Sequence, residues 1–172
     1  MQTNSRVFDD LAKLASGALG TAQGVKTEWE NLFNQRIEKM ISKADIVKVS
    51  DEDLNWMLPG AMSLRQKAEI MQEMGPSVII LTRGSEGATG FLPHGTEVTV
   101  AAEKAQIVDT VGAGDTFNAG VLAKLFELGL LTKTELKTLP PRALEQALLH
   151  GARAAAIAVS RAGANPPWAN EF

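Results

Sequence analysis

Hydrophobic positions follow two different periods along the chain, and the change comes near residue 40. In the first segment they recur at steps of three and four, which is the period of one helix face. Three glycines interrupt this pattern, and each costs a helix about 1 kcal/mol relative to alanine. We therefore expect two helical pieces, or a helix that forms only on a partner or on a membrane surface. The hydrophobic positions are Val7, Leu11, Leu14, Ala18, Ala22, Val25, Trp29 and Leu32, and the glycines are Gly17, Gly20 and Gly24.

The second segment alternates short β-branched runs with stretches of helical period. Strands are expected at 44–50 and 77–84, at two runs within 87–102 joined by a turn at His94-Gly95, and at 107–109. Helices are expected at 50–58 and 63–75, from about Asp115 to Leu128, after Thr132, and from Pro140 to Ala158. Strands that alternate with helices predict an α/β fold with a mostly parallel sheet.

The composition narrows the class of protein without identifying it. Of the 172 residues 45% are hydrophobic, which is enough for a folded core. The net charge of −3 provides no basic surface, so we expect no nucleic-acid partner. Cysteine is absent, and we see neither a secretory signal nor an apolar run of the roughly 18 residues that span a membrane. These features together favour a cytoplasmic protein.

Residues 107–125, IVDTVGAGDTFNAGVLAKL, carry the clearest chemical signal. A bend containing Gly112 and Gly114, followed by a helix from about Asp115, would leave unbonded N–H groups at the helix start. These groups favour an anion, and glycine lets an anionic oxygen approach the backbone. Asp115 could then accept the proton of an attacking hydroxyl while the amides hold a phosphoryl group. Alternatively, Asp115 is only an N-cap and the glycines merely shape the turn.

The string DTVGAGDTFNAG resembles the C-terminal signature of the PfkB, or ribokinase-like, carbohydrate kinases. With ADIVKVSDEDL, VIILTRGSEGA and ARAAAIAVSRAGANPPW it follows the second half of a fructokinase-like member. The resemblance covers residues 41–172. It implies a ribokinase-like three-layer α/β/α fold, incomplete because only the C-terminal half is matched, with an added N-terminal helix. It also implies that Gly112, Ala113 and Gly114 form an anion hole and that Asp115 is the catalytic base.

The same resemblance implies a nucleotide site in other parts of the chain. Thr82, Gly84 and Gly87 match the loop that lines the phosphates of ATP in the family. Ala152 and its neighbours would lie beside the adenine. The alternative for the three loop residues is that they form an ordinary turn after a strand.

Metal ions are implied as well, with Mg²⁺ accompanying ATP and K⁺ as a further ion. Asp109, the backbone of Val111 and the loop at Gly163 fall where relatives bind a monovalent cation. Asp53 stands where the family usually has a glutamate associated with Mg²⁺, and Ser50 where it has an asparagine. Asp109 could instead only cap the turn, and Ser50 with Asp53 also fits an N-capping pair.

Residues 1–40 resemble a different family, the BMFP/UbiK-type accessory factors, most specifically at FDDLAKLASGALG. That resemblance implies small helical proteins that form coiled-coil oligomers and associate with membranes. The expected organisation is therefore a helical segment at 1–40 followed by a kinase portion at 41–172. Membrane association through residues 1–40 is not favoured, because their polar face lacks an excess of lysine and arginine.

The favoured function is ATP-dependent phosphoryl transfer to a sugar hydroxyl, as in a fructokinase-like carbohydrate kinase. The expected partners are a nucleotide and a small sugar, with a homo-oligomer as a further possibility. Two alternatives stay open: a nucleotide-binding remnant without turnover, and a helix-mediated oligomerisation or membrane accessory protein. The segment that holds the sugar in the kinases has no counterpart in this sequence, and such positioning supplies much of the rate of a transfer reaction.

Overall fold

The computed structural model describes residues 22–172, with side chains described from residue 32 onward. The chain divides into two compact units between Met40 and Ile41. The first of these units is described from residue 22, where helix α2 begins and runs over Ala22–Ile41. This helix agrees with the helical pattern predicted for that stretch, whereas the part of the pattern that falls on residues 1–21 lies outside the described residues.

The second unit is built on a sheet of four strands in the order β1-β2-β3-β4. The strands are β1 (Ile46–Ser50), β2 (Val78–Thr82), β3 (Ala88–Leu92) and β4 (Thr96–Val100). Only β1 and β2 run parallel, while β3 and β4 each pair antiparallel with the preceding strand. The prediction of a mostly parallel sheet is therefore wrong. A short turn after β2 reverses the chain at once, so β3 returns beside β2 without the helical crossover that a parallel strand requires.

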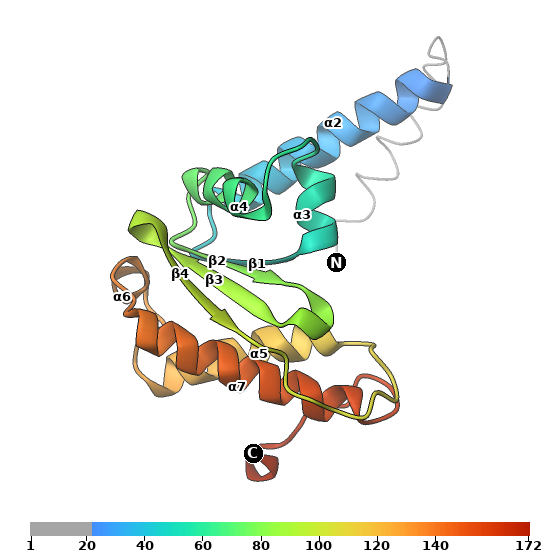
Figure 1. The fold of residues 1–172 in the computed structure, drawn as a ribbon. Helices are drawn as coiled ribbons and strands as arrows, with labels where there is room; N and C mark the ends of the chain where they lie inside the picture. Colours follow the sequence, from blue (N-terminus) through green and yellow to red (C-terminus); the bar gives the residue numbers. More distant parts are fainter. Residues whose placement is uncertain (1–21) are drawn as a thin grey trace, which may run out of the picture. The chain divides into compact units, whose positions relative to one another are not determined.

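Helices cover both faces of this sheet and give three layers (Figure 1). Helices α3 (Asp51–Met57) and α4 (Leu64–Glu73) lie on one face, and α5 (Ala113–Glu127) and α7 (Pro141–Val159) lie on the other. A short helix, α6 (Lys133–Lys137), connects α5 to α7. Three 3-10 turns complete the unit, namely η1 (Gly84–Glu86), η2 (Pro93–Gly95) and η3 (Ala169–Glu171).

Local sequence signals account for most of these boundaries. Ser63 begins α4 with a capping box completed by Gln66, and Thr132 caps α6 by accepting the N–H of Glu135. Pro141 is the first residue of α7, where its missing N–H costs no hydrogen bond. The turn expected at His94-Gly95 is η2, in which both residues have positive φ. The structure confirms these predicted boundaries. They could be predicted from the sequence because each depends only on residues within one helical turn.

The strand expected at 107–109 is absent from the sheet. Residues 101–110 have no regular secondary structure, and the side chains of Ile107 and Val108 are 67% and 57% exposed. The N–H groups of Val108 and Asp109 both donate to the carbonyl of Val159 at the end of α7, at 2.8 and 3.2 Å. The backbone N–H groups of this segment are therefore hydrogen-bonded to a helix terminus instead of to a neighbouring strand. The hydrophobicity of the segment does not distinguish these two kinds of partner.

Helices α5 and α7 approach each other closely where Gly120 faces Gly151. A methyl group built on Gly151 would lie 2.7 Å from the carbonyl oxygen of Phe117 and 2.7 Å from Cγ2 of Val121. A methyl group on Gly120 would lie 2.9 Å from the Cα of Gly151. These two glycines therefore set the separation of the helices and, with it, the position of the start of α5. Among the described residues, no helix combines the length and the apolar character required to cross a membrane.

We expect Gly151→Ala to lower the free energy of unfolding by about 1–3 kcal/mol, because the added methyl group forces α5 and α7 apart. An alanine at an open helical position would instead raise stability by about 1 kcal/mol. A fall in the free energy of unfolding would therefore indicate that the two helices lie in close contact at Gly151, whereas a rise would indicate an open position. Urea unfolding followed by circular dichroism measures it, and an unchanged or higher midpoint would show that the two helices do not pack as described.

Candidate functional site

The glycine-rich bend leads into α5 as the sequence suggests, although the helix begins two residues earlier than expected. Helix α5 starts at Ala113, and Gly112 is its N-cap with a φ of 76°. Gly112 lies against a second loop, since a methyl group on it would be 3.0 Å from Cβ of Ala164. Both the left-handed backbone and this contact require glycine at the position.

The first turn of α5 leaves main-chain N–H groups without acceptors. The N–H of Ala113 donates to the carbonyl of Thr110 at 3.2 Å, and that of Thr116 donates to Gly112 at 2.9 Å. No hydrogen bond among the described residues uses the N–H of Gly114 or of Asp115. No side chain caps the helix either. These amides are therefore available to an anion, and the helix dipole adds to their positive potential.

A lysine that the sequence analysis overlooked reaches the same turn. Lys48 comes from the middle of β1, and a methyl group built on Gly114 would lie 3.0 Å from its Nζ. The ammonium group therefore adds a full positive charge beside the unbonded amides. The sequence feature that could have indicated this role is the single lysine inside the β-branched run IVKVS. The other residues of that run are suited to a buried strand.

Asp115 is the third residue of α5 and its side chain is exposed. The reading of Asp115 as an N-cap is wrong, because Gly112 occupies that position. No hydrogen bond or ion pair of the Asp115 carboxylate is present within the described part of the chain. A carboxylate beside free amides, with no structural partner of its own, can accept a proton from a bound hydroxyl.

Asp109 joins the bend to the loop that follows α7. Its Oδ1 accepts the N–H of Val111 at 3.0 Å, and its Oδ2 accepts the N–H of Gly163 at 2.9 Å. The hydrogen bond from Val111 first, and then those from Gly163 and Thr110, hold the pKa of the Asp109 carboxyl below its ordinary value. The structure thus brings together all three residues predicted for a monovalent cation, and it shows the capping alternative for Asp109 at the same time.

The predicted phosphate loop lies at the end of the sheet where α5 begins. The carboxyl ends of β1 and β2, the turn η1 and the start of α5 occupy one end of the sheet in Figure 1. Thr82 ends β2 opposite Ser50 of β1, and its Oγ1 donates to the carbonyl of Val49 at 3.4 Å. Gly84 has a φ of 50° and open space around it. The loop therefore lies at the same end of the sheet as the bend, and its contact with phosphate stays a prediction.

Gly87 has a structural reason to be glycine in addition to any contact with a ligand. Its φ is 99°, and a methyl group on it would lie 2.1 Å from the carbonyl oxygen of Val100. The backbone of the loop therefore packs directly on the end of β4. The contact that the sequence resemblance implies for Gly87 stays a prediction.

Asp53 and Ala152, two further predicted residues, have a capping and a packing role in the structure. Ser50 caps α3, since its Oγ accepts the N–H of Asp53 at 3.0 Å and donates to Asp53 Oδ2 at 2.7 Å. This is the N-capping pair that the sequence offers as the alternative for Ser50 and Asp53. Ala152 is 9% exposed and belongs to the hydrophobic core, so little of its side chain is available to a base. Its contact with adenine stays a prediction.

No group of three or more histidine, cysteine or acidic side chains within the described residues could hold a metal ion by itself. A divalent ion can also be bound with fewer protein ligands, together with phosphate oxygens and water. Mg²⁺ is commonly held in that way, by one or two carboxylates together with substrate phosphates.

Comparison with known proteins identifies the family. The sequence model of the family described as "pfkB family carbohydrate kinase" matches residues 15–171. The chain belongs to this family. Its ribokinase-like α/β fold agrees with that membership, and the fold prediction is confirmed in this respect.

Individual pfkB relatives share only part of their length with this chain. A fructokinase of Rhizobium leguminosarum bv. trifolii is 46% identical over 110 residues, which are 63% of this chain and 33% of that protein. The structure of a Vibrio cholerae O395 fructokinase with bound fructose, ADP and calcium has a TM-score of 0.63 at 22% identity, covering 76% of this chain and 40% of its own. An aminoimidazole riboside kinase of Salmonella enterica, solved with aminoimidazole riboside and an ATP analogue, has a TM-score of 0.62 at 26% identity, covering 77% and 41%. This pfkB chain thus spans less than half the length of each.

The pfkB match also bears on the N-terminal segment. It begins at residue 15 and so includes most of residues 1–40, for which a BMFP/UbiK-like origin was expected. The comparison therefore gives no support to that origin. Residues 1–21 of the segment lie outside the described residues.

We expect Asp109→Asn to destabilise the protein at neutral pH and to do so less at low pH. The lowered pKa means that the folded state favours the carboxylate, so its contribution is present above the unfolded pKa of about 3.9 and is lost as the pH falls through the folded value. Urea unfolding of both proteins from pH 7 toward pH 3 measures the difference. Glu103→Gln, in the irregular segment that precedes the bend, controls for the removal of one negative charge. A difference that is constant with pH would contradict the role of the Asp109 carboxylate.

Proposed function

We propose that this chain carries the phosphoryl-transfer part of an ATP-dependent sugar kinase. The observation that supports this most directly is the start of α5, where the unbonded amides of Gly114 and Asp115 meet the ammonium group of Lys48. This arrangement suits a phosphate chain with several negative charges better than a single carboxylate. Membership of the pfkB family supports the same reaction class. Residues 41–172 would be the kinase portion, and residues 1–40 a separate helical segment.

The terminal phosphoryl group of ATP would lie at the amides of residues 112–115. The acceptor hydroxyl attacks the γ-phosphorus, so that a new O–P bond forms while the bond between that phosphorus and the oxygen bridging it to the β-phosphate breaks. Asp115 accepts the proton of the attacking hydroxyl, and ADP leaves with the bridging oxygen and its electron pair. Charge spreads over the equatorial oxygens during the transfer, and amides and Lys48 placed in advance stabilise it.

The remaining predicted residues would support this geometry. Thr82, Gly84 and Gly87 would line the phosphate chain, and Ala152 with its neighbours would border the adenine. Mg²⁺ would neutralise phosphate charge, and the exposed carboxylate of Asp53 would hold it through water. Asp109, Val111 and Gly163 would be the site for K⁺, because the two bonded oxygens of Asp109 keep further lone pairs.

Fructose is the first acceptor to test, because the Rhizobium relative is named a fructokinase and the Vibrio structure contains fructose and ADP. Release of ADP, coupled to a detection enzyme, measures turnover, and calorimetry measures ATP binding. Binding of ATP without turnover would favour a nucleotide-binding remnant. Absence of both ATP binding and turnover would contradict the proposal.

We expect Asp115→Asn to lower the rate of ADP release by about 10²–10⁴-fold, because the amide cannot accept the hydroxyl proton. Binding of ATP should persist or strengthen, since a negative charge beside the phosphates is removed. Glu127→Gln, at the other end of α5, is the matched control, and its rate should equal that of the unaltered protein. Equal rates for Asp115→Asn and the control would reject Asp115 as the base.

We expect Lys48→Met to weaken ATP binding by about 10–100-fold, because a charge-assisted contact with phosphate contributes about 1.5–3 kcal/mol. Methionine keeps an unbranched side chain of nearly the same length and removes the charge together with the N–H donors. Lys137→Met on the short helix α6 is the control for a loss of net charge. Calorimetry at two salt concentrations separates the local contact from general attraction, and equal ATP affinities for the two variants would contradict the placement of Lys48.

A further inference from the structure

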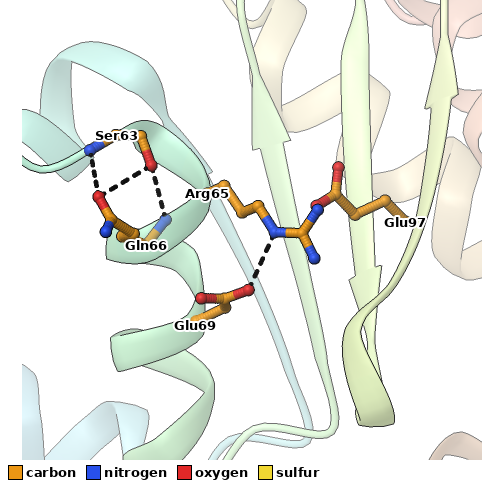
Figure 2. Close-up of polar contacts among 5 residues, drawn as sticks. All are labelled: Ser63, Arg65, Gln66, Glu69 and Glu97. Carbon is orange, nitrogen blue, oxygen red and sulfur yellow. Dashed lines mark hydrogen bonds and ion pairs between the residues drawn. The ribbon is translucent and has the colours of Figure 1, made fainter.

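Two arginines of the second unit differ in how their donors are satisfied. Arg65 of α4 is largely exposed, yet its Nε donates to Glu69 at 3.0 Å and its Nη1 pairs with Glu97 at 2.7 Å (Figure 2). Arg83, the residue that follows β2, is less exposed, and its Nε is buried without a hydrogen-bond partner. Among the side chains that the structure describes, this is the one buried nitrogen or oxygen atom left without a partner.

The unbonded Nε of Arg83 needs an explanation, because a buried donor without an acceptor costs free energy and is rare in folded proteins. The ion pair that Arg83 does form is weak. Its Nη1 lies 3.3 Å from Oε2 of Glu86, whose side chain is 71% exposed. Ion pairs with so exposed a partner contribute little to stability. The guanidinium of Arg83 therefore holds a donor for which the described chain supplies no acceptor.

The position of Arg83 indicates what kind of acceptor it would meet. It stands between Thr82 and Gly84, two of the residues predicted to line the phosphates of ATP. Its backbone is fixed, since its N–H donates to the carbonyl of Gly87 and its own carbonyl accepts the N–H of Glu86, both at 2.9 Å. Open space adjoins Gly84, and the turn lies at the end of the sheet where α5 begins (Figure 1). An anion in that space would have the guanidinium beside it.

We propose that the guanidinium of Arg83 binds the α- and β-phosphates of ATP and ADP, the part of the phosphate chain that lies outside the amides of the bend. This inference rests on the proposed kinase function, and the resemblance to the family assigns no contact to Arg83. A guanidinium presents its N–H donors in a fixed fork that matches two oxygens of a phosphate, and Nε is one arm of that fork. The phosphate would take the place of the exposed Glu86 carboxylate, because it carries more negative charge.

Arg83 and Lys48 would then act on different parts of the nucleotide. Lys48 reaches the bend at Gly114, where the terminal phosphoryl group would lie, so its charge matters more for ATP than for ADP. Arg83 would contact phosphates that ADP keeps after the transfer, so its loss should weaken the binding of ATP and ADP by the same factor. A contact of equal strength before and during the transfer raises KM when it is lost and leaves kcat nearly unchanged.

The test measures binding of ATP, ADP and inorganic tripolyphosphate to the full chain by calorimetry. We expect Arg83→Met to weaken the binding of all three by about 10–100-fold, because a charge-assisted contact is lost. Arg83→Lys keeps the charge without the fork and should recover only part of the affinity. Arg142→Met, at the exposed start of α7, is the matched control for the loss of one positive charge and should bind like the unaltered protein.

Unfolding in urea without any anion separates a binding role of Arg83 from a structural one. Arg83→Met should unfold at the same urea concentration as the unaltered protein or at a higher one, because it removes a buried donor that has no acceptor. A structural role would instead lower the midpoint and leave the binding of anions unchanged. Glu86→Gln leaves Arg83 in place and removes its competing carboxylate, so this variant should bind tripolyphosphate as tightly as the unaltered protein or more tightly.

Three results would overturn the assignment of Arg83: equal affinities for Arg83→Met and Arg142→Met, a loss of affinity for the nucleotides but not for tripolyphosphate, or weaker binding by Glu86→Gln. Failure of the proposed function gives a different result. If the unaltered protein releases no ADP with any sugar while Arg83→Met still weakens the binding of tripolyphosphate, the phosphate contact stands and the kinase activity is rejected. If turnover occurs and Arg83→Met leaves the KM for ATP unchanged, the kinase activity stands and the contact is rejected.

Discussion

The hydrogen bonds around Asp109 determine where the glycine bend lies, and the candidate site depends on them. One carboxylate oxygen accepts an N–H from the bend itself and the other accepts an N–H from the loop after α7. Two further main-chain bonds fix the approach to the bend on the carbonyl of Val159. Because these contacts use the N–H groups of Val108, Asp109, Val111 and Gly163, they hold the bend without using the amides of Gly114 and Asp115. The amides that could bind an anion stay free for that reason.

Positive potential at the bend comes from parts of the chain that are distant in sequence. Helix α5 supplies its dipole and its unbonded N–H groups, and β1 supplies the ammonium of Lys48. The close contact between Gly120 and Gly151 fixes the middle of α5 against α7, which limits movement of the helix start. Such fixed dipoles stabilise developing charge without the reorganisation that water would need. Asp115 is then an unpaired carboxylate whose position is determined by the packing of α5.

The strands of the sheet are joined by two kinds of connection, and these connections determine which strand ends lie together. The helical crossover through α3 and α4 joins the parallel strands β1 and β2, whose carboxyl ends therefore meet at one end of the sheet. Short turns join β2 to β3 and β3 to β4, so the second half of the sheet is a meander that ends at a polar edge. The parallel pair contributes Lys48 and Thr82 to the site, and the meander forms the other side of the sheet.

The sequence by itself determined the features that depend on neighbours within about one helical turn. These are the capped starts of α4, α6 and α7, the turn at His94-Gly95, and the glycine bend before α5. Family membership could also be recognised, because the motif around Asp115 is long and specific. Tertiary structure alone decided why residues 107–109 bond to a helix end instead of pairing with a strand. It alone also brought Lys48 to the bend and gave both oxygens of Asp109 their partners. Each of these rests on contacts between residues far apart along the chain, which hydrophobic periodicity and local propensity do not encode.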